Sequence, residues 1–216
     1  MKCEAVLFDL DGALLNTLKD IATSMNHALG RLGFPQHELE ACKYFIGAGR
    51  EAMALRALPD SHRDPATVVK LADLIFEEYG KHWADSTHPY DGIPALLDSL
   101  TARGIKMVIL SNKPHDSTEM TVSRLLPKWS FEVVMGAQPS LPAKPDPTSA
   151  SQIARQVDVH PEEFLFLGDS DTDMETATAA GMYPVGALWG FRTGDELLAG
   201  GAKALIEYPT HLLQLL

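Results

Sequence analysis

Residues 5–12 read Ala-Val-Leu-Phe-Asp-Leu-Asp-Gly, four apolar residues that lead into two carboxylates and a glycine. A short apolar run that ends at a turn signal predicts a buried β-strand that leaves into a loop. The two carboxylates, Asp9 and Asp11, stand one residue apart just past this strand. The stretch therefore predicts both the first strand of a sheet and a polar site at its carboxyl end.

The second half of the chain repeats this pattern with helices between the strands. Apolar runs predict strands at 106–110, 131–135, 164–167, 183–188 and, more weakly, 204–206. Helices are expected at 93–102, 114–125 and 146–157, and from Gly168-Asp169-Ser170 to Gly181. A short helix and a final helix, on either side of the weak strand, close the chain. Strands that alternate with helices favour an α/β fold, a parallel sheet with helices on both faces.

An all-helical block interrupts the pattern after the first strand. Helices are expected at about 18–32, 39–45, 51–58 and 66–83, and no convincing strand lies between Asn16 and Pro89. We therefore expect two domains, a catalytic core made of residues 1–15 and 90–216 and a helical cap made of residues 16–89.

Composition disfavours two classes of binding partner, nucleic acids and anionic membranes. The 216 residues carry 29 acidic and 18 basic side chains, a net charge of −11, which disfavours binding to nucleic acid or to an anionic membrane surface. No apolar stretch is long enough to span a membrane, and Cys3 and Cys42 form no Cys-x-x-Cys pair. We expect a cytoplasmic protein, a monomer or a homodimer, that acts on a small molecule.

The first polar site, Asp9-Leu10-Asp11-Gly12, suits covalent acid–base chemistry. Asp9 is placed to act as a nucleophile that forms an aspartyl phosphate. Asp11 is placed as the general acid that protonates the leaving oxygen and then as the base that activates water. Gly12 lets the backbone turn sharply. An ordinary turn after a strand also uses aspartate and glycine, so this segment alone favours function only about two to one.

Two further clusters offer phosphate-binding groups. Ser111-Asn112 directly follows a strand, where the Ser111 hydroxyl, Asn112 and nearby backbone N–H groups can hold a phosphate. Lys144, in a loop stiffened by two prolines, can keep Asp9 ionised and neutralise phosphoryl oxygens. Lys113 is the rival for this role and is ranked lower. Turns and exposed lysines are the ordinary alternatives.

The fourth cluster, Gly168-Asp169-Ser170-Asp171-Thr172-Asp173, suits a hard cation. Its carboxylates favour Mg2+, with water and a substrate phosphate completing an octahedron. We expect Asp9 and Asp169 as direct ligands with the Asp11 carbonyl as a third, whereas Asp173 holds coordinated water. An acidic helix start is the alternative explanation. An EF-hand is excluded because the required glycine and distal glutamate are missing.

The order Asp-x-Asp-Gly, Ser-Asn, Lys-Pro and Gly-Asp-Ser-x-x-Asp resembles the haloacid dehalogenase superfamily over essentially the whole chain. The resemblance implies a Rossmann-like core and a phosphoaspartate mechanism. The helical cap and the segments 110–114, 168–170 and 189–192 are similar to the branch that contains phosphoglycolate phosphatase. Ala13 and Asn16 depart from the usual residues of the first loop, which puts only details of that loop in doubt.

The cap is expected to choose the substrate. Gly47-Ala48-Gly49-Arg50 is the candidate segment, because Arg50 can grip a substrate carboxylate in a bidentate manner. A helix start with a solvated arginine explains the segment equally well.

Several activities stay open. The leading one is a phosphomonoester hydrolase for a small metabolite, with phosphoglycolate first. A phosphomutase, a pyrophosphatase and a nucleotidase are alternatives within the superfamily. A receiver-type phosphoryl-binding module is the non-enzymatic alternative, although a cap and an acid/base such as Asp11 disfavour it. A dehalogenase needs neither Asp11 nor Mg2+ and is also disfavoured.

Overall fold

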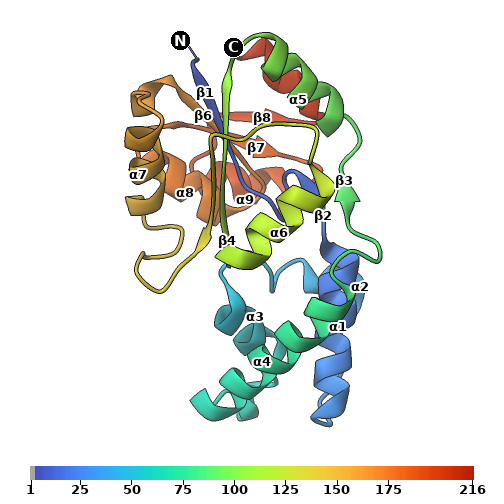
Figure 1. The fold of residues 1–216 in the computed structure, drawn as a ribbon. Coiled ribbons are helices and arrows are strands. Elements are labelled where there is room, and N and C mark those ends of the chain that lie inside the picture. The colour runs from blue at the N-terminus through green and yellow to red at the C-terminus, as the bar shows by residue number, and fades with distance from the viewer. Residues whose placement is uncertain (1–2) are drawn as a thin grey trace. The chain divides into compact units, whose positions relative to one another are not determined.

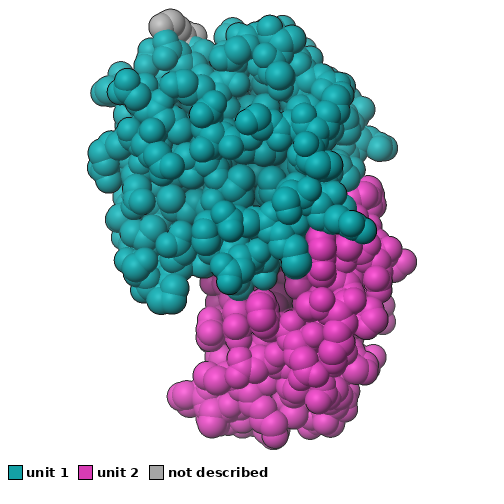
Figure 2. Space-filling view, viewed as in Figure 1, with its two compact units in different colours: residues 1–15, 89–216 teal, residues 16–88 magenta. Residues whose placement is uncertain are grey.

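The computed structural model describes residues 3–216, and the chain divides into two compact units. One unit combines the N-terminal segment up to Leu15 with Pro89–Leu216, and the other comprises Asn16–His88 (Figure 2). The links between them, β2 (Leu15–Asn16) and β3 (His88–Pro89), pair as a two-stranded sheet. These two-residue strands lie at the edges of the block for which the sequence predicts helices alone.

The first unit is built on a six-stranded sheet, and every pairing between neighbouring strands is parallel. The strands are β1 (Ala5–Phe8), β4 (Lys106–Pro114), β5 (Val133–Ala137), β6 (Phe164–Gly168), β7 (Tyr183–Ala187) and β8 (Ala204–Ile206), and their order in the sheet is β5-β4-β1-β6-β7-β8. The predicted α/β class with a parallel sheet is confirmed.

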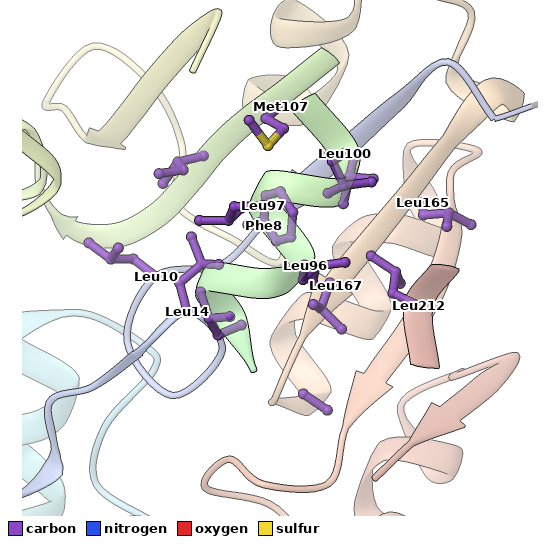
Figure 3. Packing of buried hydrophobic residues seen from close by; sticks show 14 of the residues in the cluster. Phe8, Leu10, Leu14, Leu96, Leu97, Leu100, Met107, Leu165, Leu167 and Leu212 are labelled. Atoms are coloured by element: carbon purple, nitrogen blue, oxygen red, sulfur yellow. The ribbon is translucent and has the colours of Figure 1, made fainter. Parts of the chain in front are cut away.

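Helices cover both faces of this sheet because alternate side chains of each buried strand point to opposite sides. Leu7 of β1 joins a cluster with α7 (Thr148–Gln156) and α8 (Asp171–Ala179), which lie left of the sheet in Figure 1. Phe8 joins the opposite cluster with α5 (Ile93–Ala102) and α6 (His115–Leu125). Figure 3 shows Leu96, Leu97 and Leu100 of α5 packed around Phe8.

Short elements complete the first unit. The helix α9 (Gly194–Ala199) follows β7, and 3-10 turns occupy Pro161–Glu163 and Pro209–Gln214. The last of these replaces the final helix expected from the sequence. Its Leu212 is fully buried against the α5 cluster, so the segment packs like a helix although it winds more tightly.

The second unit contains α1 (Leu18–Arg31), α2 (Leu39–Cys42), α3 (Arg50–Ala57), the 3-10 turn Asp60–His62 and α4 (Pro65–His82). The helix α2 stops three residues before the predicted end at Phe45. The two long helices, α1 and α4, pack together, and Glu78 of α4 accepts a hydrogen bond from Arg31 of α1 at 3.0 Å.

A buried carboxylate ties the end of this unit to its beginning. Asp20 on α1 accepts hydrogen bonds from the backbone N–H groups of Ser86 and Thr87 and from the Thr87 hydroxyl, at 2.9, 2.8 and 2.7 Å. Hydrogen bonds to a carboxylate are among the stronger ones in proteins. Asp20 therefore holds the segment that enters β3 against the helix that follows β2.

One strand differs in extent from the sequence prediction. The regular pairing of β4 with β5 runs to Leu110 opposite Met135 and resumes at Pro114 opposite Ala137, so four steps on β4 match two on β5. Residues 111–113 therefore form a bulge within a longer strand where the sequence predicts a loop. A bulge re-aims side chains beside a site, which local apolar patterning does not reveal. Among residues 3–216, we find no helix with the length and apolar character needed to cross a bilayer.

Candidate active site

The sheet order brings three of the predicted polar clusters to one edge. Strands β4, β1 and β6 are neighbours, and Asp9 follows β1, Asp169 follows β6, and Ser111 opens the bulge of β4. Because the strands are parallel, their carboxyl ends meet at the same side of the sheet, where α/β proteins bind ligands. Asp9, Asp169 and Ser111 are all buried at this edge.

Lys144 joins two of the carboxylates. Its ammonium group lies 2.8 Å from Oδ1 of Asp9 and 2.6 Å from Oδ1 of Asp173, and it also donates to the carbonyl of Leu110 at 3.1 Å. Three acceptors match the three N–H bonds of the ammonium. The lysine that contacts Asp9 is thus Lys144, whereas its rival Lys113 pairs with another residue.

Asn112 fixes the backbone of Lys144. Its side-chain amide donates to the Lys144 carbonyl at 3.0 Å, and its side-chain oxygen accepts the Lys144 N–H at 2.9 Å. These two bonds join the bulge of β4 to a loop 32 residues further along the chain. In the structure these two bonds make Asn112 a support for Lys144, and its binding of substrate stays a prediction. Its strand-end position was the only signal available in the sequence.

Asp173 is held by the start of α8. Its Oδ2 accepts hydrogen bonds from the N–H groups of Asp169 and Ser170 and from the Ser170 hydroxyl, at 3.2, 3.1 and 2.6 Å. The Ser170 side chain in turn caps the helix by accepting the N–H of Asp173, a capping box. Asp173 therefore belongs to the start of a helix and also lies beside Lys144 in the candidate site.

Asp169 is oriented from two other loops. The N–H of Phe191 donates to its Oδ2 at 2.8 Å, a contact that sequence reasoning missed. Gly12 has φ of +96°, and a Cβ atom there would lie 2.1 Å from Oδ2 of Asp169. Gly12 therefore allows both the turn of its own loop and the close approach of Asp169 to that loop.

Asp11 points to a different partner from Asp9. The Lys113 ammonium contacts both of its carboxylate oxygens, at 3.0 and 3.3 Å, and both side chains are largely buried. The Ser111 hydroxyl oxygen accepts the N–H of Lys113 at 3.2 Å. The pair Asp11–Lys113 spans 102 residues of sequence. Nothing in the local pattern around either residue indicates it.

Burial dominates the electrostatics of the carboxylates. It raises the pKa of Asp9 to about 7; the Lys144 charge opposes this, and the charges of Asp173 and Asp11 add to it. Burial and the charges of Asp9 and Asp173 raise the pKa of Asp169 well above its usual range. Burial opposes protonation of Lys144, but the charges of Asp173 and Asp9 outweigh it and raise the pKa of the lysine.

These residues fit a divalent cation. One oxygen from each of Asp9, Asp169 and Asp173 lies within 4.8 Å of the others, and all three residues are buried. Only two of the three buried carboxylates, Asp9 and Asp173, contact the Lys144 ammonium, so three acidic groups share one nearby positive charge. Hard oxygen donors and excess negative charge suit Mg2+.

Arg50 belongs to the second unit, at the first position of α3. Its guanidinium contacts Asp73 of α4 at 2.5 Å and lies 4.8 Å from the centre of the Phe76 ring. The expected helix start is present, and Arg50 is partly exposed and held by two residues of its own unit. Its role toward a substrate stays a prediction.

Tyr90, just after β3, was not singled out from the sequence. Burial and then the charges of Asp169 and Asp11 raise its pKa, which places its ring in the field of the site. An isolated tyrosine beside a helix start gives no sequence signal of such a position.

A comparison with protein families matches residues 6–187 to the haloacid dehalogenase-like hydrolase model. A phosphoglycolate phosphatase of Xanthomonas campestris pv. campestris is 31% identical over 96% of this chain and 94% of its own length. An N-acetylmuramic acid 6-phosphate phosphatase of Pseudomonas aeruginosa is 29% identical over 100% and 96% of the two lengths.

Solved structures share the whole fold. One from Lactobacillus delbrueckii subsp. bulgaricus superposes with a TM-score of 0.93 at 25% identity, covering 100% of this chain and 98% of the other. These findings confirm the resemblance carried by the four clusters of polar residues. The chain therefore belongs to the haloacid dehalogenase-like hydrolases, as one of the phosphoglycolate phosphatase-like enzymes of that family.

Proposed function

We propose that the protein is a Mg2+-dependent phosphatase that hydrolyses a small phosphomonoester through an aspartyl phosphate on Asp9. The observation that carries the proposal is the buried contact of Asp9 with Lys144 beside Asp169 and Asp173. A phosphatase needs an ionised nucleophile next to an anionic substrate, and only compensating positive charge makes that arrangement favourable.

The metal would be held by Asp9 and Asp169 together with the Asp11 carbonyl. It would supply positive charge to the phosphoryl oxygens and keep the carboxylates ionised. Asp173 suits an outer role through coordinated water, because its two oxygens already accept hydrogen bonds from Lys144, Asp169 and Ser170. We thus propose the ligand set expected from the sequence.

The chain's own residues then carry the reaction. An oxygen of Asp9 attacks phosphorus while the bond to the leaving oxygen breaks, and Asp11 gives that oxygen its proton. Asp11, now ionised, takes a proton from the water that attacks the phosphoaspartate, which regenerates Asp9 and releases phosphate. Ser111 and Lys144 hold the phosphoryl oxygens, and Asn112 holds Lys144.

Phosphoglycolate is the first substrate that we propose, because relatives named phosphoglycolate phosphatase match nearly the whole chain. N-acetylmuramic acid 6-phosphate is the second, since a relative named N-acetylmuramic acid 6-phosphate phosphatase matches over the whole of this chain. Both compounds carry a carboxylate as well as the phosphate, and Arg50 of the cap is our candidate for binding it. An analogue that lacks the carboxylate, N-acetylglucosamine 6-phosphate, separates recognition of the carboxylate from recognition of the sugar.

The test is phosphate release from these three compounds, from pyrophosphate and from a nucleoside monophosphate, with Mg2+ and with chelator. Asp9→Asn is compared with Asp158→Asn, a matched change at an exposed residue before β6, at the opposite end of the sheet. We expect Mg2+-dependent release that Asp9→Asn abolishes and Asp158→Asn preserves. Isomerisation of a sugar phosphate without net release would instead support the phosphomutase alternative.

We further propose that the enzyme is cytoplasmic and acts on its small substrate without nucleic acid or membrane, as a monomer or homodimer. The acidic net charge of −11 and the two free thiols, Cys3 and Cys42, support this proposal. Gel filtration combined with light scattering would decide between the two oligomeric states.

A further inference from the structure

The loop after β7, Trp189-Gly190-Phe191, has no role in the reaction described above, yet it lies against the site. Its Phe191 N–H is the donor to Oδ2 of Asp169 at 2.8 Å. A backbone N–H that donates to a buried carboxylate fixes the orientation of that carboxylate. The loop thus contacts one of the two carboxylates that we assign as direct metal ligands.

Gly190 lets this loop come so close. A Cβ atom at Gly190 would lie 2.2 Å from the Cβ of Asp169 and 2.6 Å from its Oδ2. A side chain at Gly12 would likewise clash with this carboxylate. Two glycines from separate loops therefore leave room for the Asp169 side chain.

Trp189 joins these two loops to each other. Its indole N–H donates to the carbonyl of Ala13 at 3.0 Å, although the two residues are 176 positions apart. Ala13 follows Gly12 in the first loop, and Trp189 precedes Gly190, so the bond joins the two segments whose glycines approach Asp169. The loop after β7 thereby contacts both the metal ligand and the segment that carries Asp9 and Asp11.

We propose that Trp189-Gly190-Phe191 is a positioning element for Asp169 and sets the affinity of the site for Mg2+. This inference rests on the proposed function, because it takes Asp169 as a metal ligand. Groups that orient a ligand contribute strongly to metal affinity, and their loss costs about 10- to 100-fold. Gly190 is the residue on which the fit depends most, since no larger side chain has room there.

Gly190→Ala tests the proposal by sterics alone. The backbone of Gly190 does not adopt the left-handed conformation, so alanine meets no penalty in φ and acts through its Cβ. Gly80→Ala is the matched control, because Gly80 lies within α4 and a Cβ there would meet no atom within 4 Å. Both variants are made in the full chain.

The measurement is calorimetric titration of Mg2+ without substrate, together with the Mg2+ concentration that gives half-maximal phosphate release. For Gly190→Ala we expect the Mg2+ dissociation constant and the activation constant to rise about 10- to 100-fold. The KM for substrate at saturating Mg2+ should change little, which separates a loss of metal affinity from general damage. Gly80→Ala should match the wild-type protein in all three quantities.

Trp189→Phe provides a second test that keeps one aromatic ring and removes the indole N–H together with part of the ring surface. It should weaken Mg2+ binding by a smaller factor, and it decides the question if Gly190→Ala does not fold. Wild-type Mg2+ constants in Gly190→Ala, or in Trp189→Phe where the first variant is unfolded, would overturn the proposal. A wild-type protein that neither binds Mg2+ nor needs it would instead refute the proposed function.

Discussion

At the scale of single residues, Asn112 shows how the site depends on groups that need not touch a substrate. Its two hydrogen bonds to the Lys144 backbone hold the loop that carries the lysine. Removing both leaves two buried backbone groups without these partners, and each such loss costs about 1 kcal/mol or more. Lys144 would then lose its fixed approach to Asp9.

We therefore expect Asn112→Ala to lower the free energy of unfolding by about 2 kcal/mol and kcat by at least about 10-fold. Asn112→Asp keeps an acceptor for the Lys144 N–H and loses the donor. Its unfolding free energy and its kcat should lie between those of the wild-type protein and of Asn112→Ala. Urea unfolding and steady-state kinetics measure both effects. An alanine variant with wild-type kcat would show that Lys144 needs no such support.

The ionisation of Asp9 predicts how pH affects metal binding. Its pKa is about 7 in the metal-free protein and near 3.8 when unfolded, so between these values the folded state binds more protons than the unfolded state. Ionisation of Asp9 therefore reduces stability as pH rises through this window. Mg2+ binds the ionised carboxylate, so protons compete with the metal below pH 7.

The rise in melting temperature on adding Mg2+ should accordingly be larger at about pH 8 than at about pH 5.5. Asp9→Asn should weaken this pH dependence. Scanning calorimetry with and without Mg2+ at both values gives the answer. Equal shifts at the two pH values would contradict a metal-free pKa of Asp9 near 7.

At the scale of elements, the start of α8 combines helix capping with the chemistry of the site. Ser170 caps the helix, and its hydroxyl donates to the same Asp173 whose other oxygen contacts Lys144. Asp64 caps α4 in the second unit by accepting the N–H and hydroxyl of Thr67, far in sequence from these residues. The two caps allow a matched comparison.

Ser170→Ala and Asp64→Ala should each lower stability by about 1 kcal/mol, the usual value of a lost N-cap. For a chain of this size that corresponds to a fall of about 2–4 °C in melting temperature. Only Ser170→Ala should also lower kcat, because it removes one of the hydrogen bonds that hold Asp173. Equal kcat in the two variants would separate the cap from the site.

The elements also show what the sequence can and cannot predict. Apolar runs such as 5–8 and 164–167 were enough to predict β1 and β6, because strands buried on both faces are apolar throughout. The bulge of β4 was missed because its shape depends on pairing with β5. The sequence predicts a longer helix than the observed α2, because the position of a helix end depends on tertiary context.

The same limit applies inside the site. Asp9, Asp169, Asp173 and Lys144 were identified from their places at strand ends and in a stiff loop, and the structure brings them together. The sequence does not indicate two contacts that support the site, the ion pair of Lys113 with Asp11 and the hydrogen bond from Phe191 to Asp169. These contacts join residues 102 and 22 positions apart, where a local pattern carries no information.

At the scale of the whole molecule, the first unit contains its own hydrophobic core. Both clusters of buried apolar residues around the large sheet draw only on residues up to Leu15 and from Ile93 onward. The links to the second unit, β2 and β3, pair with each other, so the inserted unit leaves and returns at neighbouring points. A short glycine-rich connection can therefore replace residues 17–87.

We expect this shortened protein to fold and to bind Mg2+ with an affinity within about 10-fold of the full chain, since every assigned ligand remains. It should lose preference among phosphomonoesters, because the residues expected to select the substrate, Arg50 among them, are gone. Circular dichroism, Mg2+ calorimetry and the substrate panel measure these properties. A shortened protein that is unfolded would show that the first unit depends on the second.

The central claim concerns Asp9 as the nucleophile, and trapping of the phosphorylated enzyme tests it most directly. Protein quenched in acid during turnover of phosphoglycolate with Mg2+ is digested and the peptide that contains residue 9 is weighed by mass spectrometry. The account predicts a phosphoryl group on Asp9 that is absent in Asp9→Asn and in chelator. Phosphate release at the wild-type rate by Asp9→Asn, or a phosphoryl group on another residue, would contradict it.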